Sequence, residues 1–374
     1  MLYFVVTTLE VRGRRDSYDV LLGFGLLREI GRIVSKRMAR GRCAIITDEN
    51  VGALFGPNVC AALSQAAIQP LVVTLPVGEQ SKNLQQVSSI CERMATAGLD
   101  RTSFVVGLGG GVVGDISGFV AAIYHRGIAH IQIPTTLLAM VDSSIGGKTG
   151  VNTTTGKNVV GAVHPPAIII DDLEVLRTLP PRDVKQGFAE IIKHGIIADR
   201  AMFEQLRSSV DPVQLFNSES SAVEELVRRN IEIKSRIVEE DELDRTGSRA
   251  VLNFGHTIGH AIERAGDYAR FAHGEAISLG MVAAAAISVR RAGLAESART
   301  VIVEVLTRFG LPIQLPDDAS QAAILEAVKL DKKFEGGEIR FVVTPAIGTA
   351  YVSDGVTWED IRGAIAELQT ARSL

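Results

Sequence analysis

The sequence predicts an α/β domain followed by a mostly α-helical domain. The chain has 374 residues, and about 150 residues per domain is the usual prior. Its first half alternates short β-branched runs with amphipathic stretches, a rhythm typical of a parallel sheet with crossover helices. After Pro180 the pattern changes to long helices. We therefore expect domains at residues 1–180 and 181–374.

The expected strands of the first domain are short and rich in β-branched residues. They are Cys43–Thr47, Leu71–Leu75, Phe104–Gly107, His130–Ile133 and Ile168–Ile170. Amphipathic helices are expected between them at Val51–Ala67 and Leu84–Ala97. The apolar start Met1–Val6 has no preceding basic residues, so we expect a first strand there rather than a signal peptide.

Helical periodicity dominates the second domain. The expected helices are Arg182–Ala198, Ser221–Glu240, Asn253–Ala265, His273–Arg291, Ala298–Phe309 and Ala319–Leu330. One hairpin is expected, pairing Glu338–Thr344 with Thr349–Ser353. The longest apolar helix, Ala276–Val289, is too short to span a bilayer.

Charge and cysteine content narrow the classes of partner. The formal net charge is −4 and the pI is about 6, so no general nucleic-acid-binding surface is implied. The cysteines Cys43, Cys60 and Cys91 lack metal or redox spacing and are expected to be reduced thiols. We expect a soluble, cytoplasmic protein with no nucleic-acid or membrane partner.

A glycine-rich turn follows the expected strand at Phe104–Gly107. Gly109–Gly114 matches G-x-G-x-x-G, and glycines at a helix start let backbone N–H groups approach a pyrophosphate. The match alone is weak, and a tight structural turn is the alternative. Asp48 follows a strand, where its carboxylate could accept from ribose hydroxyls. Glu79 and Lys82 begin another helix, and an ordinary charge pair is the alternative there.

Polar residues and glycines crowd the segment from Asp142 to Asn158. Lys148 and Lys157 each follow a glycine, and we expect a turn-rich loop between them; lysine acts as a point charge for phosphate or carboxylate. Asp142 could hold a hydroxyl. A merely solvated loop is the alternative, and it is disfavoured because polar loops in α/β domains usually carry function.

Three of the seven histidines lie within 18 residues: His256, His260 and His273. His256 and His260 are four apart and share one helix face, which favours them as a metal-ligand pair. A surface pair with a capping histidine is the alternative. Glu190 and Lys193 share a face among apolar residues, where a structural salt bridge is the alternative. Lys234, Arg249 and the segment Asp331-Lys332-Lys333 are uninformative alone.

Taken together, six motifs resemble the 3-dehydroquinate synthases, of the sugar phosphate cyclase family. They occur in order between Asp48 and Lys333: GGGVVGDISGFVAAIYHRG, IPTTLLAMVDSSIGGKTGVN, GKNVVGAVHPP, GFAEIIKHG, LNFGHTIGHAIE and HGEAISLGM. The chain has His194 where the family often has tyrosine and Ile258 where it often has phenylalanine. Neither departure removes a functional group.

The resemblance implies a Rossmann-like NAD domain and a helical domain that binds metal and substrate. It implies a metal, usually zinc with cobalt possible, held by Glu190, His256 and His273, and it moves His260 to the substrate. The implied NAD-binding residues are Asp48, Glu79, Lys82, Gly109, Gly110, Gly111, Asp115, Thr135, Thr136, Lys148, Lys157, Thr178 and Leu179.

The implied substrate is the sugar acid phosphate 3-deoxy-D-arabino-heptulosonate 7-phosphate. The implied substrate and catalytic residues are Arg126, Asp142, Lys148, Asn158, Glu190, Lys193, Lys234, Arg249, Asn253, His260 and one of Lys332 and Lys333. The implied reaction oxidises an alcohol with NAD, eliminates phosphate, returns the hydride, opens the ring and closes a carbocycle by aldol addition. Net redox is therefore zero. A homodimer is implied, with Arg126 acting across subunits.

Three rival functions remain. A sister cyclase would use another sugar phosphate, although the intact Asp142–Lys148 motif favours dehydroquinate formation. A metal-dependent alcohol or glycerol dehydrogenase shares the architecture but needs few cations. A non-catalytic NAD or sugar-phosphate sensor would have lost a ligand or a lysine, and the sequence shows no such loss.

Overall fold

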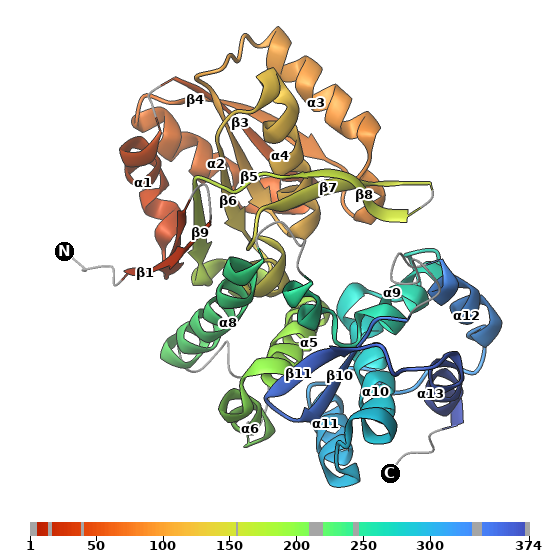
Figure 1. Ribbon diagram of the computed structural model, residues 1–374. Coiled ribbons are helices and arrows are strands. Elements are labelled where there is room, and N and C mark those ends of the chain that lie inside the picture. The colour runs from red at the N-terminus through yellow and green to blue at the C-terminus, as the bar shows by residue number, and fades with distance from the viewer. Residues whose placement is uncertain are drawn as a thin grey trace. The chain divides into compact units, whose positions relative to one another are not determined.

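The computed structural model describes residues 6–13, 17–38, 41–154, 156–208, 220–241, 247–330 and 339–370 (Figure 1). The chain forms two compact units. The first comprises residues 1–180 and 219–243, and the second comprises residues 181–218 and 244–374. Among the described residues, no helix is long and apolar enough to cross a membrane.

A seven-stranded sheet forms the centre of the first unit. Its order is β1-β2-β9-β6-β5-β3-β4. Strand β1 pairs antiparallel with β2, and all the other pairs are parallel. The five strands expected within the α/β pattern are confirmed, whereas β2 was not predicted. The expected first strand at Met1–Val6 shares only Val6 with β1, and its residues 1–5 lie outside the described residues. The bounds are β1 Val6–Val11, β2 Tyr18–Gly23, β3 Arg42–Asp48, β4 Gln69–Leu75, β5 Phe104–Gly109, β6 His130–Pro134 and β9 Ile168–Asp172.

Helices pack against this sheet through alternating strand residues. The helices are α1 (Ile30–Arg37), α2 (Glu49–Gln65), α3 (Leu84–Thr96) and α4 (Gly111–Ile123). Ala44 and Ile46 of β3 belong to a core that also contains Ile90 of α3 and Ile116 of α4. Because side chains alternate along a strand, this period of two places α3 and α4 on one face of the sheet.

A second hairpin, β7 (Lys148–Thr153) with β8 (Gly156–Val163), packs against α4. The turn-rich loop that we expected between Lys148 and Lys157 is therefore wrong, because these residues form a strand pair. Gly150 and Gly161 are cross-strand partners, and a Cβ at Gly161 would lie 2.1 Å from the Thr149 carbonyl oxygen. These glycines let the two backbones approach closely within the strand pair. In the sequence, the same glycine content is typical of a loop.

Helix α8 (Ser220–Glu240) belongs to the first unit, although we expected it in the second domain. It packs against β1, β2 and the short helix η4 (Ala139–Ser143). The Thr7 hydroxyl donates to Glu224 Oε1 at 2.8 Å, and the Arg12 N–H donates to Glu239 Oε1 at 2.8 Å. The continuous range 181–374 therefore does not describe the second unit.

The second unit is built around α10 (His273–Ala292), which is buried along Ala276–Ser288. It packs against α5, α9, α11, α13 and β10. The remaining bounds are α5 Pro181–Ala198, α6 Arg200–Ser208, η6 Ser248–Asn253, α9 His256–Ala265, α11 Glu296–Arg308, α12 Gln321–Lys329, β10 Phe341–Ala346, β11 Thr349–Ser353 and α13 Trp358–Thr370. The hairpin is confirmed, with Glu338 outside the described residues, whereas α6 and α13 were not predicted.

Helix α9 begins at His256, not at Asn253 as expected. Gly255 has φ 78°, a left-handed conformation that interrupts the helix before His256. A Cβ at Gly280 of α10 would lie 1.9 Å from the Gly255 carbonyl oxygen. Two glycines therefore let the start of α9 touch α10, which fixes His256 relative to that helix.

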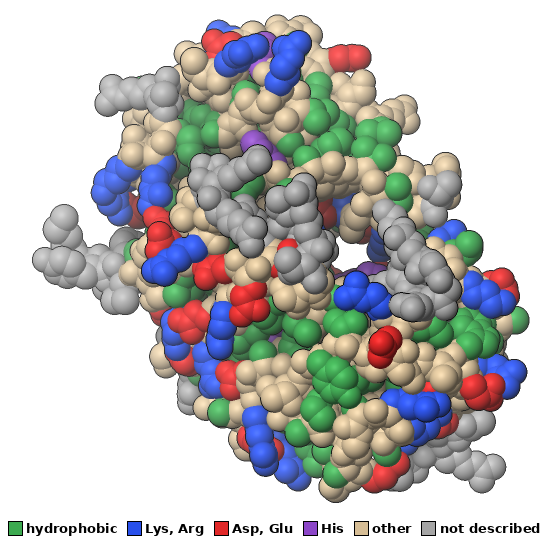
Figure 2. Space-filling view, viewed as in Figure 1, with side chains coloured by type: hydrophobic (Ala, Val, Ile, Leu, Met, Phe, Trp, Pro, Cys, Tyr) green, Lys and Arg blue, Asp and Glu red, His purple; other side chains and the backbone are tan. Residues whose placement is uncertain are grey.

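On the face shown in Figure 2, positively and negatively charged side chains are interspersed. This mixture agrees with the small net charge of −4. On this face, an anionic ligand would therefore meet local groups of mixed charge rather than a broad positive surface.

Candidate active site

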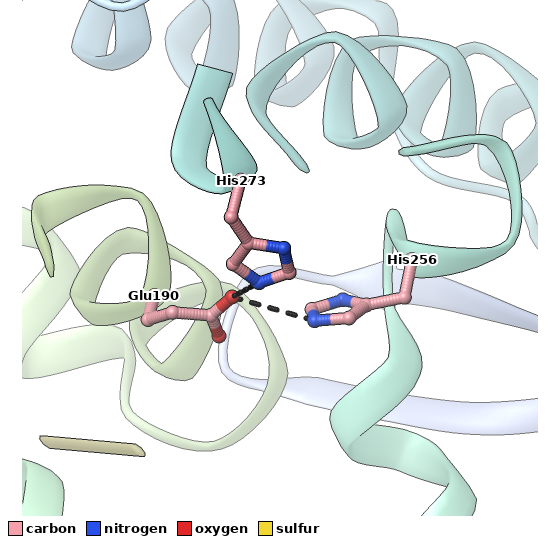
Figure 3. Close-up of side chains that lie close together, drawn as sticks. All are labelled: Glu190, His256 and His273. Carbon is pink, nitrogen blue, oxygen red and sulfur yellow. Dashed lines mark ion pairs between the residues drawn. The ribbon is translucent and has the colours of Figure 1, made fainter. Parts of the chain in front are cut away.

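Three side chains of the second unit converge on one point (Figure 3). Glu190 comes from the middle of α5, while His256 and His273 are the first residues of α9 and α10. Glu190 Oε1 lies 3.3 Å from His256 Nε2 and 3.4 Å from His273 Nε2. These three residues form a group that could hold a metal ion.

The spacing of these atoms fits a tetrahedral zinc ion. Zinc bonds to histidine nitrogen and carboxylate oxygen are about 2.0–2.2 Å, so neighbouring tetrahedral ligand atoms lie roughly 3.3–3.5 Å apart. The observed separations of 3.3 and 3.4 Å fall in that range. Among the described residues, neither Glu190 oxygen has a partner that meets hydrogen-bond geometry, although Lys193 forms an ion pair with Oε2.

Lys193 supplies a buried positive charge beside this cluster. Its ammonium pairs with Glu190 Oε2, and both side chains are almost fully buried. Burial alone would raise the pKa of Glu190, but Lys193 and His256 outweigh it and hold that pKa well below its usual range. Glu190 is therefore ionised, and its second oxygen is paired with Lys193.

Each histidine of the cluster has its other ring nitrogen placed by a second contact. His256 Nδ1 lies 3.2 Å from the Phe254 carbonyl oxygen, and His273 Nδ1 lies 3.3 Å from Glu263 Oε2. Burial lowers the pKa of His256, whereas contacts with Glu190 and Glu263 overcome burial and raise the pKa of His273 to about 10. Sequence reasoning missed Glu263, although it shares a face of α9 with His256.

His260 lies near the cluster but is exposed. Its ring centroid is 5.2 Å from that of His256 and 6.1 Å from that of His273. It belongs to a second possible group with Glu263 and His273. Among the described residues, no such group contains both His256 and His260, the pair that spacing alone favoured.

The glycine-rich turn of the first unit leads directly into a helix. Gly109 ends β5, Gly110 precedes α4, and no side chain caps the start of α4. A Cβ at Gly111 would lie 2.9 Å from Ser143 Oγ, and one at Gly110 would lie 3.1 Å from the Thr136 methyl group. Uncapped helical N–H groups in so tight a turn suit a phosphate.

A polar network lies beside this turn. The Lys82 ammonium pairs with Asp115 and donates to Asn158 Oδ1 at 2.5 Å. Asn152 Nδ2 donates to Glu79 Oε1 at 2.7 Å, and Asn152 Oδ1 accepts from the Asn158 N–H at 3.0 Å.

Lys157 Nζ lies 3.6 Å from Glu79 Oε1, which adds a second lysine to the network. Burial raises the pKa of Asp115, although Lys82 opposes that shift. The network therefore joins five expected site residues through Asn152, which sequence reasoning left without a role.

A second pair in the first unit joins Asp142 of η4 to Lys234 of α8, with Lys234 Nζ 2.6 Å from Asp142 Oδ1. Asp48 instead caps α2, accepting from the N–H groups of Asn50 and Val51. Thr135 is buried after β6, and the Thr136 hydroxyl accepts from the Ala139 N–H.

The remaining expected site residues lie at the ends of elements or in short helices. Lys332 and Lys333 lie outside the described residues. The others are Arg126 in η3 (Tyr124–Arg126), Lys148 at the start of β7, Thr178 and Leu179 at the end of η5 (Leu173–Thr178), and Arg249 and Asn253 in η6.

Comparisons with known proteins cover most of the chain. A family model for the 3-dehydroquinate synthase N-terminal domain matches residues 72–186, and one for its C-terminal domain matches residues 187–334. The chain is 42% identical to a 3-dehydroquinate synthase of Pelobacter propionicus, over 93% of this chain and 96% of the relative. It is 41% identical to one of Caulobacter vibrioides, over 97% and 99%.

Solved structures share the fold across the whole chain. ValA, a 2-epi-5-epi-valiolone synthase of Streptomyces hygroscopicus with NAD+ and Zn2+ bound, has a TM-score of 0.86 and 26% identity, covering 96% of this chain and 98% of its own. A 2-deoxy-scyllo-inosose synthase complexed with carbaglucose-6-phosphate, NAD+ and Co2+ has a TM-score of 0.87 and 26% identity, covering 96% and 100%.

A glycerol dehydrogenase of Schizosaccharomyces pombe is more distant, with 15% identity and a TM-score of 0.66, over 94% of this chain and 88% of its own. That likeness shows a shared fold alone. The matches to both family models and the near-full-length identities above 40% establish the relationship, and the chain belongs to the 3-dehydroquinate synthase family.

Proposed function

We propose that this chain is a 3-dehydroquinate synthase, a carbon–oxygen lyase. It converts 3-deoxy-D-arabino-heptulosonate 7-phosphate to 3-dehydroquinate and phosphate, with NAD and a divalent metal, most simply zinc, as cofactors. The observation that carries the proposal is the 42% identity to an enzyme of that name over more than nine-tenths of both chains. The metal-compatible cluster and the glycine-rich turn agree with it independently.

Glu190, His256 and His273 would hold the metal. A divalent metal with three protein ligands supplies a Lewis acid that acidifies a coordinated hydroxyl. Lys193 keeps Glu190 ionised and engages its second oxygen, so one oxygen is directed at the histidines. This arrangement places a fixed positive charge beside the metal site, where an anionic substrate benefits from it.

The residues of the first unit would hold NAD. The cofactor supplies a hydride acceptor that returns its hydride in the same catalytic cycle. The uncapped start of α4 after Gly110 would receive the pyrophosphate, and Lys82 pairs with the half-buried Asp115 beside it. Asn152 and Asn158 orient Glu79 and Lys82, so the polar contacts to a dinucleotide are set before it binds.

Cations and hydroxyl-binding groups would fix the substrate. We assign its carboxylate and phosphate to Lys148, Lys193, Lys234 and Arg249, because lysine and arginine match those anions. Asp142 accepts from a hydroxyl while Lys234 holds it in place. The further substrate contacts in the proposal are Arg126, Asn158, Asn253 and His260. A homodimer and a cytoplasmic location are also parts of the proposal.

A substrate comparison tests the function. The protein, loaded with zinc and NAD, is incubated separately with 3-deoxy-D-arabino-heptulosonate 7-phosphate, sedoheptulose 7-phosphate and glucose 6-phosphate, and released phosphate is measured. We expect rapid release from the first sugar alone. Turnover of sedoheptulose 7-phosphate without turnover of the first sugar would move the chain to a sister cyclase.

A substitution of His256 tests where the metal binds. His256→Ala is expected to lose both metal and activity, because it removes one of three ligands. The matched control is Arg362→Ala, which should keep both, because Arg362 is an exposed residue of α13 whose ion pair is with Glu359. Full metal content in His256→Ala would show that the metal lies elsewhere.

A further inference from the structure

We propose that Glu263 is a positioning residue that sets the orientation of His273 toward the metal, an inference that rests on the proposed metal-dependent function. Glu263 is 2% exposed and lies on α9, while His273 begins α10. Glu263 Oε2 is 3.3 Å from His273 Nδ1. The opposite ring nitrogen, Nε2, is 3.4 Å from Glu190 Oε1.

The imidazole of His273 therefore lies between two carboxylates, one at each nitrogen. A carboxylate oxygen can only accept, so the hydrogen bond between Glu263 Oε2 and His273 Nδ1 requires a proton on Nδ1. Loss of the Nε2 proton would leave a lone pair on that nitrogen, which faces Glu190 and His256, while Nδ1 stays protonated toward Glu263. One contact thus selects both the tautomer and the rotation of the ring.

His256 shows the same arrangement with a different acceptor. Its Nδ1 lies 3.2 Å from the Phe254 carbonyl oxygen, and its Nε2 lies 3.3 Å from Glu190 Oε1. Both histidines thus present Nε2 to one carboxylate oxygen because an oxygen acceptor occupies Nδ1. In both histidines, a contact at Nδ1 therefore orients the ring on the side away from Glu190.

The backbone of Glu263 also shapes the connection to His273. Its carbonyl oxygen accepts from the Gly266 N–H at 3.2 Å and from the Tyr268 N–H at 2.8 Å, which closes the end of α9. The chain then returns to α10, whose first residue is His273. Glu263 thus contacts both the side chain and the backbone that place this ligand.

A competing group shares two of these residues. Glu263, His260 and His273 also lie close enough to hold a metal, with Glu263 as a direct ligand. The geometry favours the Glu190 group because the Nε2 atoms of both histidines approach one oxygen of its carboxylate. In that group Glu263 acts through His273 and does not bind the metal.

Metal affinity measured without turnover tests the proposal. Zinc is titrated into metal-free protein against a chromophoric chelator, and Co2+ spectra report the ligand set. Glu263→Gln is nearly isosteric and removes the charge, so we expect zinc affinity to fall roughly 10- to 100-fold with one metal per chain and an unchanged cobalt spectrum. Glu263→Asp keeps the charge on a shorter arm, and its affinity should be intermediate. His260→Ala is the matched control and should bind zinc as tightly as the parent protein.

Several results would overturn this role. Unchanged zinc affinity in Glu263→Gln would remove the orienting function, and complete metal loss in both Glu263→Gln and His260→Ala would place the metal in the competing group. Melting temperatures of the metal-free variants separate misfolding from weaker binding. A parent protein that binds no metal would instead contradict the proposed metal-dependent function itself.

Discussion

Asp171 offers a prediction about stability that is separate from the site. It lies on β9 opposite Leu22 of β2, is fully buried, and neither carboxylate oxygen has a hydrogen-bond partner among the described residues. Burial raises the pKa of Asp171 well above its usual value. The neighbouring Asp172 is different, because its oxygens accept from the N–H groups of Gly25, Leu27 and Glu174.

The sign of the effect follows from proton binding. An unfolded aspartate has a pKa near 3.9. Between that value and the raised folded pKa, folded Asp171 retains a proton that the unfolded chain has lost, so the free energy of unfolding falls as pH rises. The stability that protonated Asp171 contributes is fully present below the unfolded pKa. It is lost as pH rises toward the folded pKa, and the free energy of unfolding falls by about 1.4 kcal/mol per pH unit.

Asp171→Asn removes this titration while nearly preserving shape. We expect the variant to gain stability over the parent protein as pH rises from about 5 to 8, by roughly 3–6 °C in melting temperature per pH unit below the folded pKa, for a unit of this size. Scanning calorimetry across that range measures the difference. Asp172→Asn is the control and should be less stable at every pH, because an amide NH2 would face backbone donors.

Parallel melting curves for the parent protein and Asp171→Asn at all pH values would refute this reasoning. They would mean that the Asp171 carboxylate is charged in the folded protein and has a counter-charge or donor that the buried geometry does not show.

Three further predictions concern the two units. Glu190→Gln in metal-free protein should lower the free energy of unfolding in urea by about 3–5 kcal/mol, because it leaves Lys193 buried without a counter-charge. Equal stability of the two proteins would contradict a structural role for the Glu190–Lys193 pair. Asn152→Ala should weaken NAD binding in calorimetry roughly 30-fold, since it removes two hydrogen bonds worth about 1 kcal/mol each that hold Glu79 and Asn158. An unchanged Kd would remove Asn152 from the network. Gly118→Ala should lower the free energy of unfolding in urea by about 1–3 kcal/mol, because its Cβ would lie 2.2 Å from the Thr149 methyl group. Adding Thr149→Ser removes that methyl group and should recover part of the lost stability. The absence of any recovery would contradict that contact.

Much of the first unit could be predicted because buried parallel strands have a clear local signature. The runs Cys43–Thr47 and Ile168–Ile170 are continuously apolar or β-branched, which suits strands covered on both faces. The glycine-rich turn at Gly109 follows such a strand, so its placement at the start of α4 was also predictable. Local composition carries this information.

The departures arise where long-range contacts decide the outcome. Helix α8 has an ordinary helical pattern, and only its contacts with β1, β2 and η4 place it in the first unit. The glycines of the β7–β8 hairpin have the same composition as a loop, but here they allow two strands to approach closely. Periodicity cannot distinguish these cases.

The candidate site was also predicted in part from local spacing, while the rest of it depends on long-range contacts. Spacing identified the histidine cluster, but local periodicity paired His256 with His260, whereas the structure brings Glu190 and His273 to His256. The family resemblance proposed the latter set. Neither approach found Glu263 or Asn152, because their roles depend on contacts with residues on other elements.

The most direct test of the central claim is the balance of hydride and phosphate. The protein, with zinc and NAD far below the substrate concentration, is given 3-deoxy-D-arabino-heptulosonate 7-phosphate, and phosphate and NADH are followed together. We expect many phosphates to be released per NAD, with no accumulating NADH, because the hydride is returned in each cycle. Steady accumulation of NADH, or phosphate release that stops at one equivalent of NAD, would contradict it.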